Sequence, residues 1–362
     1  MSICYYISSH GFGHAVRATE IIRHLPDEAP LIVKSGAPAW FLHDELKGRN
    51  FQLFEESCDC GAIQFDGLRI DALATLQTTR ALAAKNKELL KAEADLLKAH
   101  DVRLVVSDIP PFACRIAQEA GISSLVIANF TWVEICQPMV AAYPEFADVL
   151  EELRADYALA DLALIVSPHT AIDVFPHSEP APMVARRGHC IREELAAELG
   201  FAPDRKLFLI YFGELGIDGA DWRQLEQFDD AIFLSLQPLA EQCANLIHLE
   251  QGRWRHPNLT ASCDAIIAKP GYGILGECLA NGTPLVYTSR EGFAEYFALE
   301  AVLRQWAGGI FIPPADFKAF RWSPYLEQLG RRDLPPPFPL NGAQYCAKRI
   351  MQLYDHARPN HG

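Results

Sequence analysis

The sequence predicts an α/β protein made of two domains, each built on a parallel β-sheet. Short apolar runs alternate with segments of helical periodicity in both halves of the chain, and this alternation favours parallel strands that helices cover on both faces. The 362 residues are enough for two domains with sizeable cores. Between the halves, the proline-rich stretch 177–183 indicates a linker. We therefore expect an N-terminal domain at 1–180, a C-terminal domain at 181–340 and a last segment at 341–362.

The expected elements follow from the apolar pattern in chain order. In the first half the strands are Ile3–Ile7, Leu31–Lys34, Leu104–Ser107, Leu125–Ala128 and Leu162–Val166. The helices there are Ala15–His24, Ala39–Leu46, Phe112–Ala120 and a long one from Asp71 to about Ala99. In the second half the strands are Leu207–Phe212, Ala231–Leu236, Leu246–His248, Ala265–Ala268 and Leu285–Thr288, with helices near Ile274–Asn281 and Asn341–Ala357. In parallel sheets of this kind, ligands bind at the carboxyl ends of the strands.

Charge and composition narrow the classes of partner. The net charge of −14 argues against a nucleic-acid backbone or an anionic membrane, because either would call for a basic surface. No apolar run approaches the roughly 20 residues that a membrane-spanning helix needs, so we expect a cytoplasmic protein with no integral membrane segment. Most of the ten cysteines lie inside apolar runs, which is typical of a reducing compartment. Cys58 and Cys60 form one C-x-C without a second pair at zinc spacing, so no metal is expected.

The stretch Ala265–Pro284 combines a strand, a glycine turn and a helix start. Lys269 and Pro270 end the strand, and the glycines at 271 and 273 allow a tight turn close to a ligand. The helix start presents unpaired N–H groups and suits a phosphate, while Glu277 in the expected first turn is placed to accept from two ribose hydroxyls. The alternative is an ordinary strand–turn–helix unit in which Glu277 only complements the helix dipole.

This stretch, with the YTSREGFAEYFALE that follows it, resembles the nucleotide-sugar signature of glycosyltransferases with the GT-B fold, and is similar to that of the peptidoglycan GlcNAc transferase. That fold consists of two Rossmann-like domains whose parallel sheets face a central cleft, with a last helix that packs back on the N-terminal domain. The resemblance implies that Gly271, Tyr272, Gly273 and Ile274 hold the donor diphosphate and that Glu277 holds the ribose. Lys269, Gly213 and Ser235 lie at neighbouring strand ends and are further donor candidates.

Longer motifs give a narrower resemblance. YYISSHGFGHAVRATEIIRHL, CDCGAIQFDGLRIDALATL, VVSDIPPFACRIAQEAGISSLVIANFTW and AKPGYGILGECLANGTPLVY resemble the glycosyltransferase-like N-terminal half of plant L-arabinokinase and its bacterial relatives. The resemblance runs from the first strand to about Trp306. We find no sugar-kinase loop and do not expect arabinose phosphorylation. Where many sugar-nucleotide transferases carry an Asp-Gln pair, this chain has Arg290, Glu291 and Glu295, so the donor sugar does not follow from the resemblance.

The turn after the first strand, SSHGFGHAVR, supplies the candidate base. A histidine suits this role because its pKa lies near neutrality and the neutral ring can take a proton from an acceptor hydroxyl. His14 is the expected catalytic base, on its resemblance to the Gly-His pair of glycosyltransferases, with His10 in reserve. Asp108 ends a strand at the same rim and is expected to orient the imidazole. The alternatives are histidines that line the turn and an aspartate that caps the next helix.

The remaining acceptor-side candidates lie around these groups. Arg17 either meets a phosphate or acidic acceptor or lies on the surface, and Pro138–Asp156 is a candidate cover for the acceptor. Asn129 and Trp132 either line the cleft or belong to the core. Gly11, Phe12 and Gly13 complete the set.

The sequence thus predicts a glycosyltransferase that moves a sugar from a nucleoside-diphosphate sugar to a small-molecule or glycan hydroxyl. The expected reaction is metal-independent and inverting, with a UDP-sugar as the favoured co-substrate and no prosthetic group. The alternatives are a nucleotide-sugar sensor, a GT-B sugar-nucleotide 2-epimerase and an interaction protein with a vestigial cleft. Either a monomer or a homodimer is expected.

Overall fold

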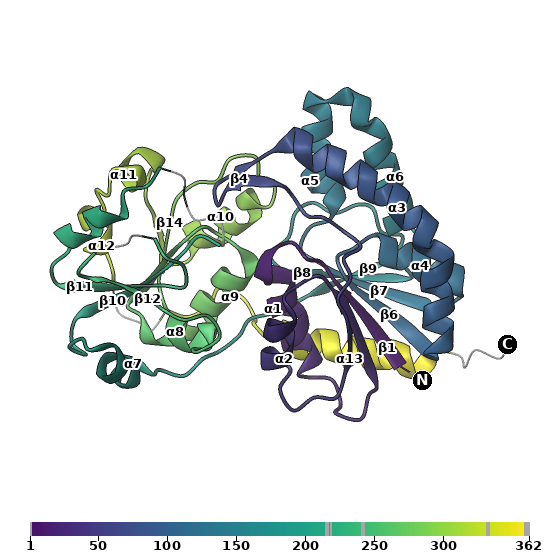
Figure 1. Cartoon of the computed structure of the whole chain (residues 1–362), viewed down its shortest axis with the longest axis horizontal. Helices are drawn as coiled ribbons and strands as arrows, with labels where there is room; N and C mark the ends of the chain where they lie inside the picture. The colour runs from purple at the N-terminus through teal and green to yellow at the C-terminus, as the bar shows by residue number, and fades with distance from the viewer. Residues whose placement is uncertain (1, 214–216, 218, 240–242, 331–333, 358–362) are drawn as a thin grey trace. The chain divides into compact units, whose positions relative to one another are not determined.

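The computed structural model describes residues 2–213, 217, 219–239, 243–330 and 334–357, in two compact units (Figure 1). The N-terminal unit comprises Met1–Ile63, Ile70–Val184 and Asn341–Gly362, and the C-terminal unit comprises Gln64–Arg69 and Ala185–Leu340. The units therefore meet along the sequence at Val184–Ala185 rather than at 180–181. The short segment Gln64–Arg69, expected in the first domain, belongs to the second.

The N-terminal unit is built on a seven-stranded, fully parallel sheet in the order β3-β2-β1-β6-β7-β8-β9. The strands are β1 (Ser2–Ile7), β2 (Leu31–Ser35), β3 (Gln52–Phe54), β6 (Val102–Asp108), β7 (Ser123–Ala128), β8 (Leu162–Val166) and β9 (Ser178–Ala181). The strand order reverses at the β1–β6 pair, where Ile7 lies opposite Asp108. In open parallel sheets the carboxyl edge at such a reversal is where ligands bind.

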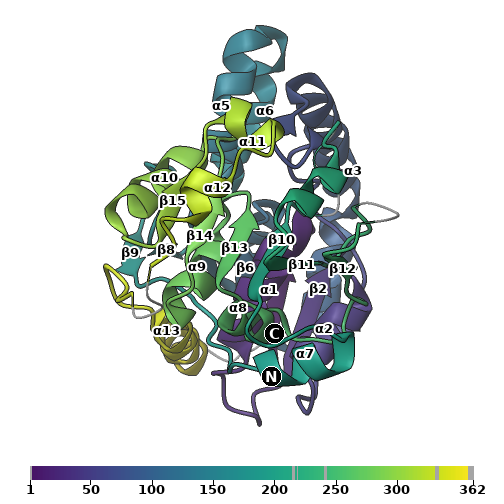
Figure 2. The same ribbon diagram turned by 90° about the vertical axis from the view of Figure 1, so that its left-hand side faces the viewer.

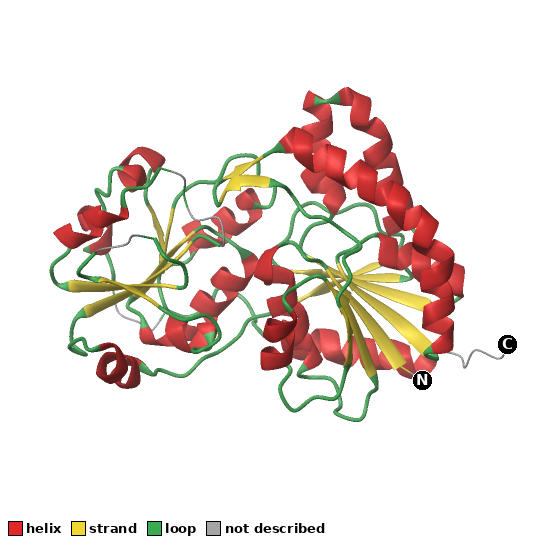
Figure 3. Cartoon of the chain, in the orientation of Figure 1, coloured by secondary structure: helices red, strands yellow, loops and turns green. Residues whose placement is uncertain are grey.

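Helices cover the sheet of this unit (Figure 3). Alternating residues of β1 divide the core between the two faces of the sheet. Ile3, Tyr5 and Ile7 pack with α1 (Gly11–Ile22), α2 (Ala39–Glu45) and α13 (Gly342–His356). Cys4 and Tyr6 pack on the other face with α3 (Ala72–Ala99) and α4 (Phe112–Ala120). The last helix of the chain is therefore part of the N-terminal core.

Two elements of this unit differ from the expectation. The proline-rich stretch taken as a linker contains β9, an edge strand in which Pro180 is tolerated because only one side of the strand needs hydrogen bonds. Helix α1 begins at Gly11, not at Ala15, so the expected glycine-rich loop is a helix start in which Gly11 adopts φ +63°. The expected long helix is confirmed as α3, where Asp71 caps the N-terminus by accepting a 2.9 Å hydrogen bond from the Ala74 N–H.

The C-terminal unit has a six-stranded parallel sheet in the order β12-β11-β10-β13-β14-β15, which Figure 2 shows from β15 across to β12. Its strands are β10 (Lys206–Tyr211), β11 (Ala231–Ser235), β12 (Leu246–His248), β13 (Ala265–Ala268), β14 (Leu285–Tyr287) and β15 (Gly309–Phe311). Its helices are α7 (Arg192–Leu199), the 3-10 helix η2 (Trp222–Gln227), α8 (His256–Ser262), α9 (Tyr272–Asn281), α10 (Tyr296–Gln305), α11 (Pro314–Lys318) and α12 (Ser323–Leu326). A hairpin of two short strands, β4 (Gln64–Asp66) and β5 (Arg69–Ile70), contacts this unit. The Leu68 side chain packs on the core of the unit, and the Leu68 carbonyl accepts a 3.0 Å hydrogen bond from the Glu291 N–H.

The connection after β7 completes the N-terminal unit. It forms α5 (Trp132–Ala142), the 3-10 helix η1 (Pro144–Phe146) and α6 (Ala147–Tyr157). None of the helices described is long and apolar enough to cross a membrane. Within the described ranges, no group of three or more His, Cys, Asp or Glu side chains is arranged to hold a metal ion.

Candidate active site

The carboxyl edge of the N-terminal sheet brings His14 and Asp108 together. His14 lies in the first turns of α1, directly after β1, and Asp108 is the last residue of the neighbouring β6. His14 Nδ1 and Asp108 Oδ1 are 2.8 Å apart. If Nδ1 carries the proton and donates to the carboxylate, Nε2 keeps a lone pair for an incoming hydroxyl. No described residue hydrogen-bonds to Nε2, and the side chain of His14 is 7% exposed.

Arg17 is part of the same cluster and is buried, not a surface residue. Its Nε donates to Asp108 Oδ2 at 2.8 Å and its Nη2 to Asp108 Oδ1 at 2.6 Å, and the guanidinium also donates to Asn129 Oδ1. Burial raises the pKa of Asp108, but Arg17 and then His14 outweigh it and hold that pKa below its ordinary value. The carboxylate is therefore charged and paired, and Arg17 fixes its position with a two-pronged contact.

Asn129 and Trp132 are buried at the same edge of the sheet, where each makes hydrogen bonds with its side chain. Asn129 is buried and donates to the carbonyls of Val166 (2.6 Å) and Pro168 (2.9 Å) while it accepts from Arg17, so it holds Arg17 rather than lining a cleft. Trp132 begins α5 and is 5% exposed, with its Nε1–H donating to Asp59 Oδ2 at 2.9 Å.

Asp59 is a functional candidate that sequence reasoning missed. It lies between Cys58 and Cys60, and its Oδ1 accepts from the Ser9 N–H at 3.3 Å, in the turn that leads to His14. Burial raises the pKa of Asp59 above its ordinary value, although hydrogen bonds from Ser8 and Trp132 and the nearby His14 oppose the shift. In the sequence, Asp59 stands between two cysteines, and the interpretation of this stretch considered the two thiols as metal ligands and not the carboxyl group.

The other expected acceptor residues lie around the start of α1. Gly11 and Gly13 are exposed there, and half-buried Phe12 packs on Phe41 of α2 with ring centroids 4.9 Å apart. His10 precedes the helix and stands edge-on to Trp132, with ring centroids at 5.6 Å. Of the two histidines, His14 has the geometry of a base oriented by a carboxylate, through its 2.8 Å contact with Asp108.

In the C-terminal unit, three neighbouring strand ends carry the expected donor residues. Gly213 follows β10, Lys269 follows β13 and Arg290 follows β14. Gly213 has φ +75°, which disfavours a side chain, and a Cβ there would lie 3.0 Å from Lys269 Nζ. Burial lowers the pKa of Lys269 to about 7, and the charge of Arg290 adds to the shift. Lys269 is thus not a plain surface lysine.

Arg290 adds a second buried cation at this edge. Its Nη1 donates to the Pro270 carbonyl at 3.4 Å, directly before α9, and lies 3.5 Å from Glu295 Oε1. The guanidinium stacks on the Phe293 ring, 3.2 Å from its centroid. Burial lowers the pKa of Arg290 to about 10. Glu291 is exposed and pairs through its backbone with the β4–β5 hairpin.

Helix α9 begins earlier than expected, with Gly271 as its N-cap and Tyr272, Gly273 and Ile274 in its first turn. Gly271 has no side chain with which to cap the helix. The start of α9 lies directly after Lys269, and the N–H groups of a helix start suit an anion. Ser235, by contrast, uses its hydroxyl in its own turn, donating to the Gln237 carbonyl at 2.7 Å.

Glu277 lies in the second turn of α9, not in the first. It is 2% exposed, and its Oε1 accepts from Arg186 while its Oε2 accepts from Thr260 (3.0 Å) and contacts His256 Nδ1 (2.6 Å). Burial raises the pKa of Glu277, but Arg186 and His256 outweigh it and bring it to about 2. The ribose contact expected for Glu277 would require one of these partners to leave.

Comparisons with known proteins agree with this architecture. Residues 1–157 match the model of the family described as glycosyl transferase family 1. Acinetobacter baumannii MurG aligns with 97% of this chain and 99% of its own, with a TM-score of 0.56 and 14% identity. Phytolacca americana UGT2, in complex with UDP-2fluoro-glucose and pterostilbene, aligns with 99% of this chain and 95% of its own, with a TM-score of 0.57 and 14% identity. The chain therefore has the GT-B fold.

One curated relative is more similar in sequence to this GT-B chain. The L-arabinokinase of Arabidopsis thaliana is 30% identical over 331 residues, which make up 90% of this chain and 32% of that protein. The chain therefore spans about a third of the length of the relative that it matches. An alignment of 331 residues extends into both units.

Proposed function

We propose that this GT-B chain is a glycosyltransferase that uses a nucleoside-diphosphate sugar, most favourably a UDP-sugar. The observation that carries the proposal is the 2.8 Å contact between His14 Nδ1 and Asp108 Oδ1 at the carboxyl edge of a parallel sheet. It supplies what a hydroxyl nucleophile needs, namely an oriented imidazole whose second nitrogen has no partner among the described residues. The family match of residues 1–157 covers this pair.

In the proposed reaction, His14 Nε2 removes the proton from an acceptor hydroxyl as that oxygen attacks the anomeric carbon. The bond from the anomeric carbon to the diphosphate breaks, and the nucleoside diphosphate leaves with its electron pair. Asp108, held by Arg17, stabilises the imidazolium that forms. A single displacement of this kind inverts the anomeric configuration.

The proposed donor site lies on the C-terminal unit, at the start of α9. The N–H groups after Gly271, together with Lys269 and Arg290, offer positive charge to the diphosphate and to its charge as it leaves. Gly213 admits the phosphate close to Lys269, whereas Glu295 and Glu291 are candidates for sugar hydroxyls. Because its oxygens are already occupied, we assign Glu277 to the anchoring of Arg186 instead of to the ribose.

The choice of UDP follows from a structural neighbour and from no residue of this chain. The Phytolacca americana protein binds UDP-2fluoro-glucose, and its fold matches both units. The matches do not favour the alternative of a sensor or of a sugar-nucleotide 2-epimerase.

The test is turnover of sugar nucleotides. The purified chain is incubated with UDP-glucose, UDP-GlcNAc, UDP-galactose and UDP-arabinose beside pooled small-molecule alcohols and oligosaccharides, and UDP release is measured. We expect one of these sugar nucleotides to give UDP release that depends on an acceptor. His14→Ala should abolish this release. The control is His24→Ala, which changes an exposed histidine of the same chain segment and should retain it. Equal release by His14→Ala and the wild type would remove the base from this account.

A further inference from the structure

Two acids flank the turn that leads from β1 into α1. The Ser8 N–H donates to the Asp108 carbonyl at 2.8 Å, and the next N–H along the chain, that of Ser9, donates to Asp59 Oδ1 at 3.3 Å. Both acids are buried, Asp108 fully and Asp59 with 7% of its surface exposed. Asp108 serves the proposed reaction, and the position of Asp59 on the same turn makes it a candidate for a second role there.

The contact of Asp108 with His14 does not by itself leave a negative charge for an imidazolium. Arg17 donates to both oxygens of that carboxylate, and its Nη2 lies 3.4 Å from His14 Nδ1. A cation at this distance balances the charge of Asp108 and disfavours a second positive charge on the ring. Because Asp108 and Arg17 together are neutral, a protonated His14 would leave an excess positive charge in a buried cluster, which costs free energy.

We propose that Asp59 is the counter-ion of the His14 imidazolium that forms during sugar transfer. The inference rests on the proposed function, in which the ring takes a proton from the acceptor hydroxyl. With Asp59 as a carboxylate, the cluster of Asp59, Asp108, Arg17 and His14 carries one net negative charge before that proton arrives and none afterwards. Asp59 acts through His14, so it is a positioning residue and not a catalytic one.

The hydrogen bonds of Asp59 suit a carboxylate. Its Oδ1 accepts from the Ser9 N–H and its Oδ2 from the Trp132 Nε1–H at 2.9 Å, and N–H groups of these two kinds can only donate. Burial raises the pKa of Asp59, while the Ser8 hydroxyl, His14 and Trp132 oppose the shift. Coupling between two ionisable groups is reciprocal, so the Asp59 carboxylate favours the imidazolium as much as the imidazolium favours the carboxylate.

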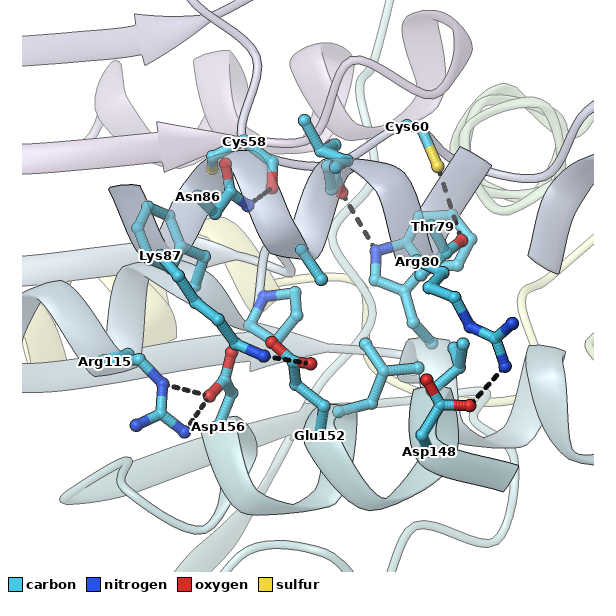
Figure 4. Close-up of a pocket in the computed structure, with 18 of the residues that line it drawn as sticks. Cys58, Cys60, Thr79, Arg80, Asn86, Lys87, Arg115, Asp148, Glu152 and Asp156 are labelled. Atoms are coloured by element: carbon cyan, nitrogen blue, oxygen red, sulfur yellow. Dashed lines mark hydrogen bonds and ion pairs between the residues drawn. The ribbon is translucent and has the colours of Figure 1, made fainter. Parts of the chain in front are cut away.

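The loop that carries Asp59 is held from both of its flanks by α3 (Figure 4). Asn86 of that helix donates to the Cys58 carbonyl at 3.0 Å, and the Cys60 thiol lies 3.5 Å from the Thr79 hydroxyl. A carboxylate that is fixed in this way needs no reorganisation when the ring becomes charged.

The thiols and phenols around the cluster do not add charge. Burial raises the pKa of each of them, and they are Cys58 and Cys60 beside Asp59, Cys136 of α5, Tyr157 of α6, Tyr5 of β1 and Cys346 of α13. Glu134 of α5 accepts from the N–H and the hydroxyl of Thr131, both at 2.7 Å. His10, directly before α1, is a second imidazole, so an experiment has to distinguish it from His14.

The experiment follows the protonation of His14 by NMR in the full chain, labelled with carbon-13 at histidine Cε1. The His14 and His10 signals are assigned by their absence in His14→Gln and His10→Gln. We expect the titration midpoint of His14 to fall by about one pH unit in Asp59→Asn, because the imidazolium loses a buried counter-ion. The matched control is Glu45→Gln, which changes another buried acid of the same unit, paired with Arg23 at 2.7 Å. It should leave the His14 midpoint unchanged.

Turnover provides the second measurement. Asp59→Asn should lower the plateau rate of UDP release by about tenfold and move the acid limb of the pH profile to lower pH, since one pH unit corresponds to a tenfold change in the stability of the imidazolium. Asp59→Glu keeps the charge and should change both quantities less. The signals of the other histidines report whether each variant is folded.

An unmoved or raised His14 midpoint in Asp59→Asn would overturn the proposal. Equal shifts in Asp59→Asn and Asp59→Glu would do the same, because they would trace the effect to packing and not to charge. The NMR titration needs no turnover, which separates this failure from that of the proposed function. If the wild type releases no UDP from any sugar nucleotide, the proposed function fails, and the midpoint still shows whether Asp59 and His14 are coupled.

Discussion

Two buried clusters in this GT-B chain contain the same three kinds of side chain. In the N-terminal unit, Asp108 is held by Arg17 and contacts His14, and in the C-terminal unit, Glu277 is held by Arg186 and contacts His256. In both, the arginine and the histidine outweigh burial and lower the pKa of the carboxyl group. Composition alone therefore does not distinguish a catalytic cluster from a structural one.

Position distinguishes them. Asp108 ends a strand and His14 follows the neighbouring strand, so their imidazole lies at the sheet edge where ligands bind. Glu277 lies in the second turn of α9 and faces α8, and His256 Nε2 is buried without a hydrogen-bond partner. A histidine of the second kind has no route to a substrate hydroxyl. We therefore propose catalysis for the first cluster, whereas the contacts of the second join α8, α9 and the chain segment after Val184.

The largest expected effect is that of Asp108→Asn on turnover. The amide no longer accepts from His14 in the same way and does not stabilise the imidazolium, so the rate of UDP release should fall by about 10² to 10⁴-fold. Steady-state rates with saturating donor measure this. A rate within a factor of two of the wild type would show that the carboxylate does not assist His14.

Glu277→Gln should act on stability instead. It removes the charge that pairs with Arg186 and leaves a buried guanidinium without its counter-ion, so the free energy of unfolding of the C-terminal unit should fall by ~3 to 5 kcal/mol. Urea unfolding followed by fluorescence measures the change. The matched control is Glu291→Gln, an exposed side chain in the same unit, which should stay within ~0.5 kcal/mol. A similar loss in both variants would contradict the anchoring role.

The acid dependence of stability follows from the same cluster. The folded state lowers the pKa of Glu277 from 4.5 to about 2, so its contribution is fully present above pH 4.5 and is lost as the pH falls through about 2. The size is ~3 kcal/mol, from 1.36 kcal/mol for each pKa unit. Unfolding measured between pH 6 and pH 2 should therefore show a loss in the wild type that is smaller in Glu277→Gln, and parallel curves would refute the assignment.

A smaller effect is expected at the proposed donor site. Because the pKa of Lys269 is about 7, a large share of the amine is neutral at pH 8, and a bound diphosphate should draw a proton onto it. Calorimetric titration with UDP at pH 8 in two buffers of different ionisation enthalpy should show proton uptake in the wild type. Lys269→Met should remove the uptake and weaken UDP binding about tenfold, whereas Lys206→Met should do neither. Equal uptake by both variants would place the proton elsewhere.

The smallest effect on the free energy of unfolding is expected for the loss of an exposed ion pair. Lys206 and Asp230 form an ion pair at 2.7 Å, but their side chains are 55% and 60% exposed. Lys206→Met should change the free energy of unfolding by no more than ~0.5 kcal/mol, because water and salt screen such a pair. A larger loss in urea unfolding would weaken the contrast between buried and exposed pairs on which the comparison depends.

Local pattern predicted most of the fold and part of the site. The apolar alternation located most strands, and the ends of parallel strands indicated that His14 and Asp108 share an edge. The partners of buried charges were not predictable in this way, because Arg17 and Asp108 are separated by 91 residues, as are Arg186 and Glu277. The role of Asp59 was missed for the same reason, since its contacts to Ser9 and Trp132 are long-range.

The most direct test of the account is to compare His14→Ala with His256→Ala in two assays, UDP release and urea unfolding. We predict that His14→Ala loses sugar transfer by at least about 10²-fold and also loses some stability, because Asp108 loses a buried partner. His256→Ala should retain the rate and lose ~1 to 3 kcal/mol of stability, because Glu277 loses a buried partner. The reverse pattern, or equal rates in the two variants, would contradict the assignment of catalysis to the N-terminal edge.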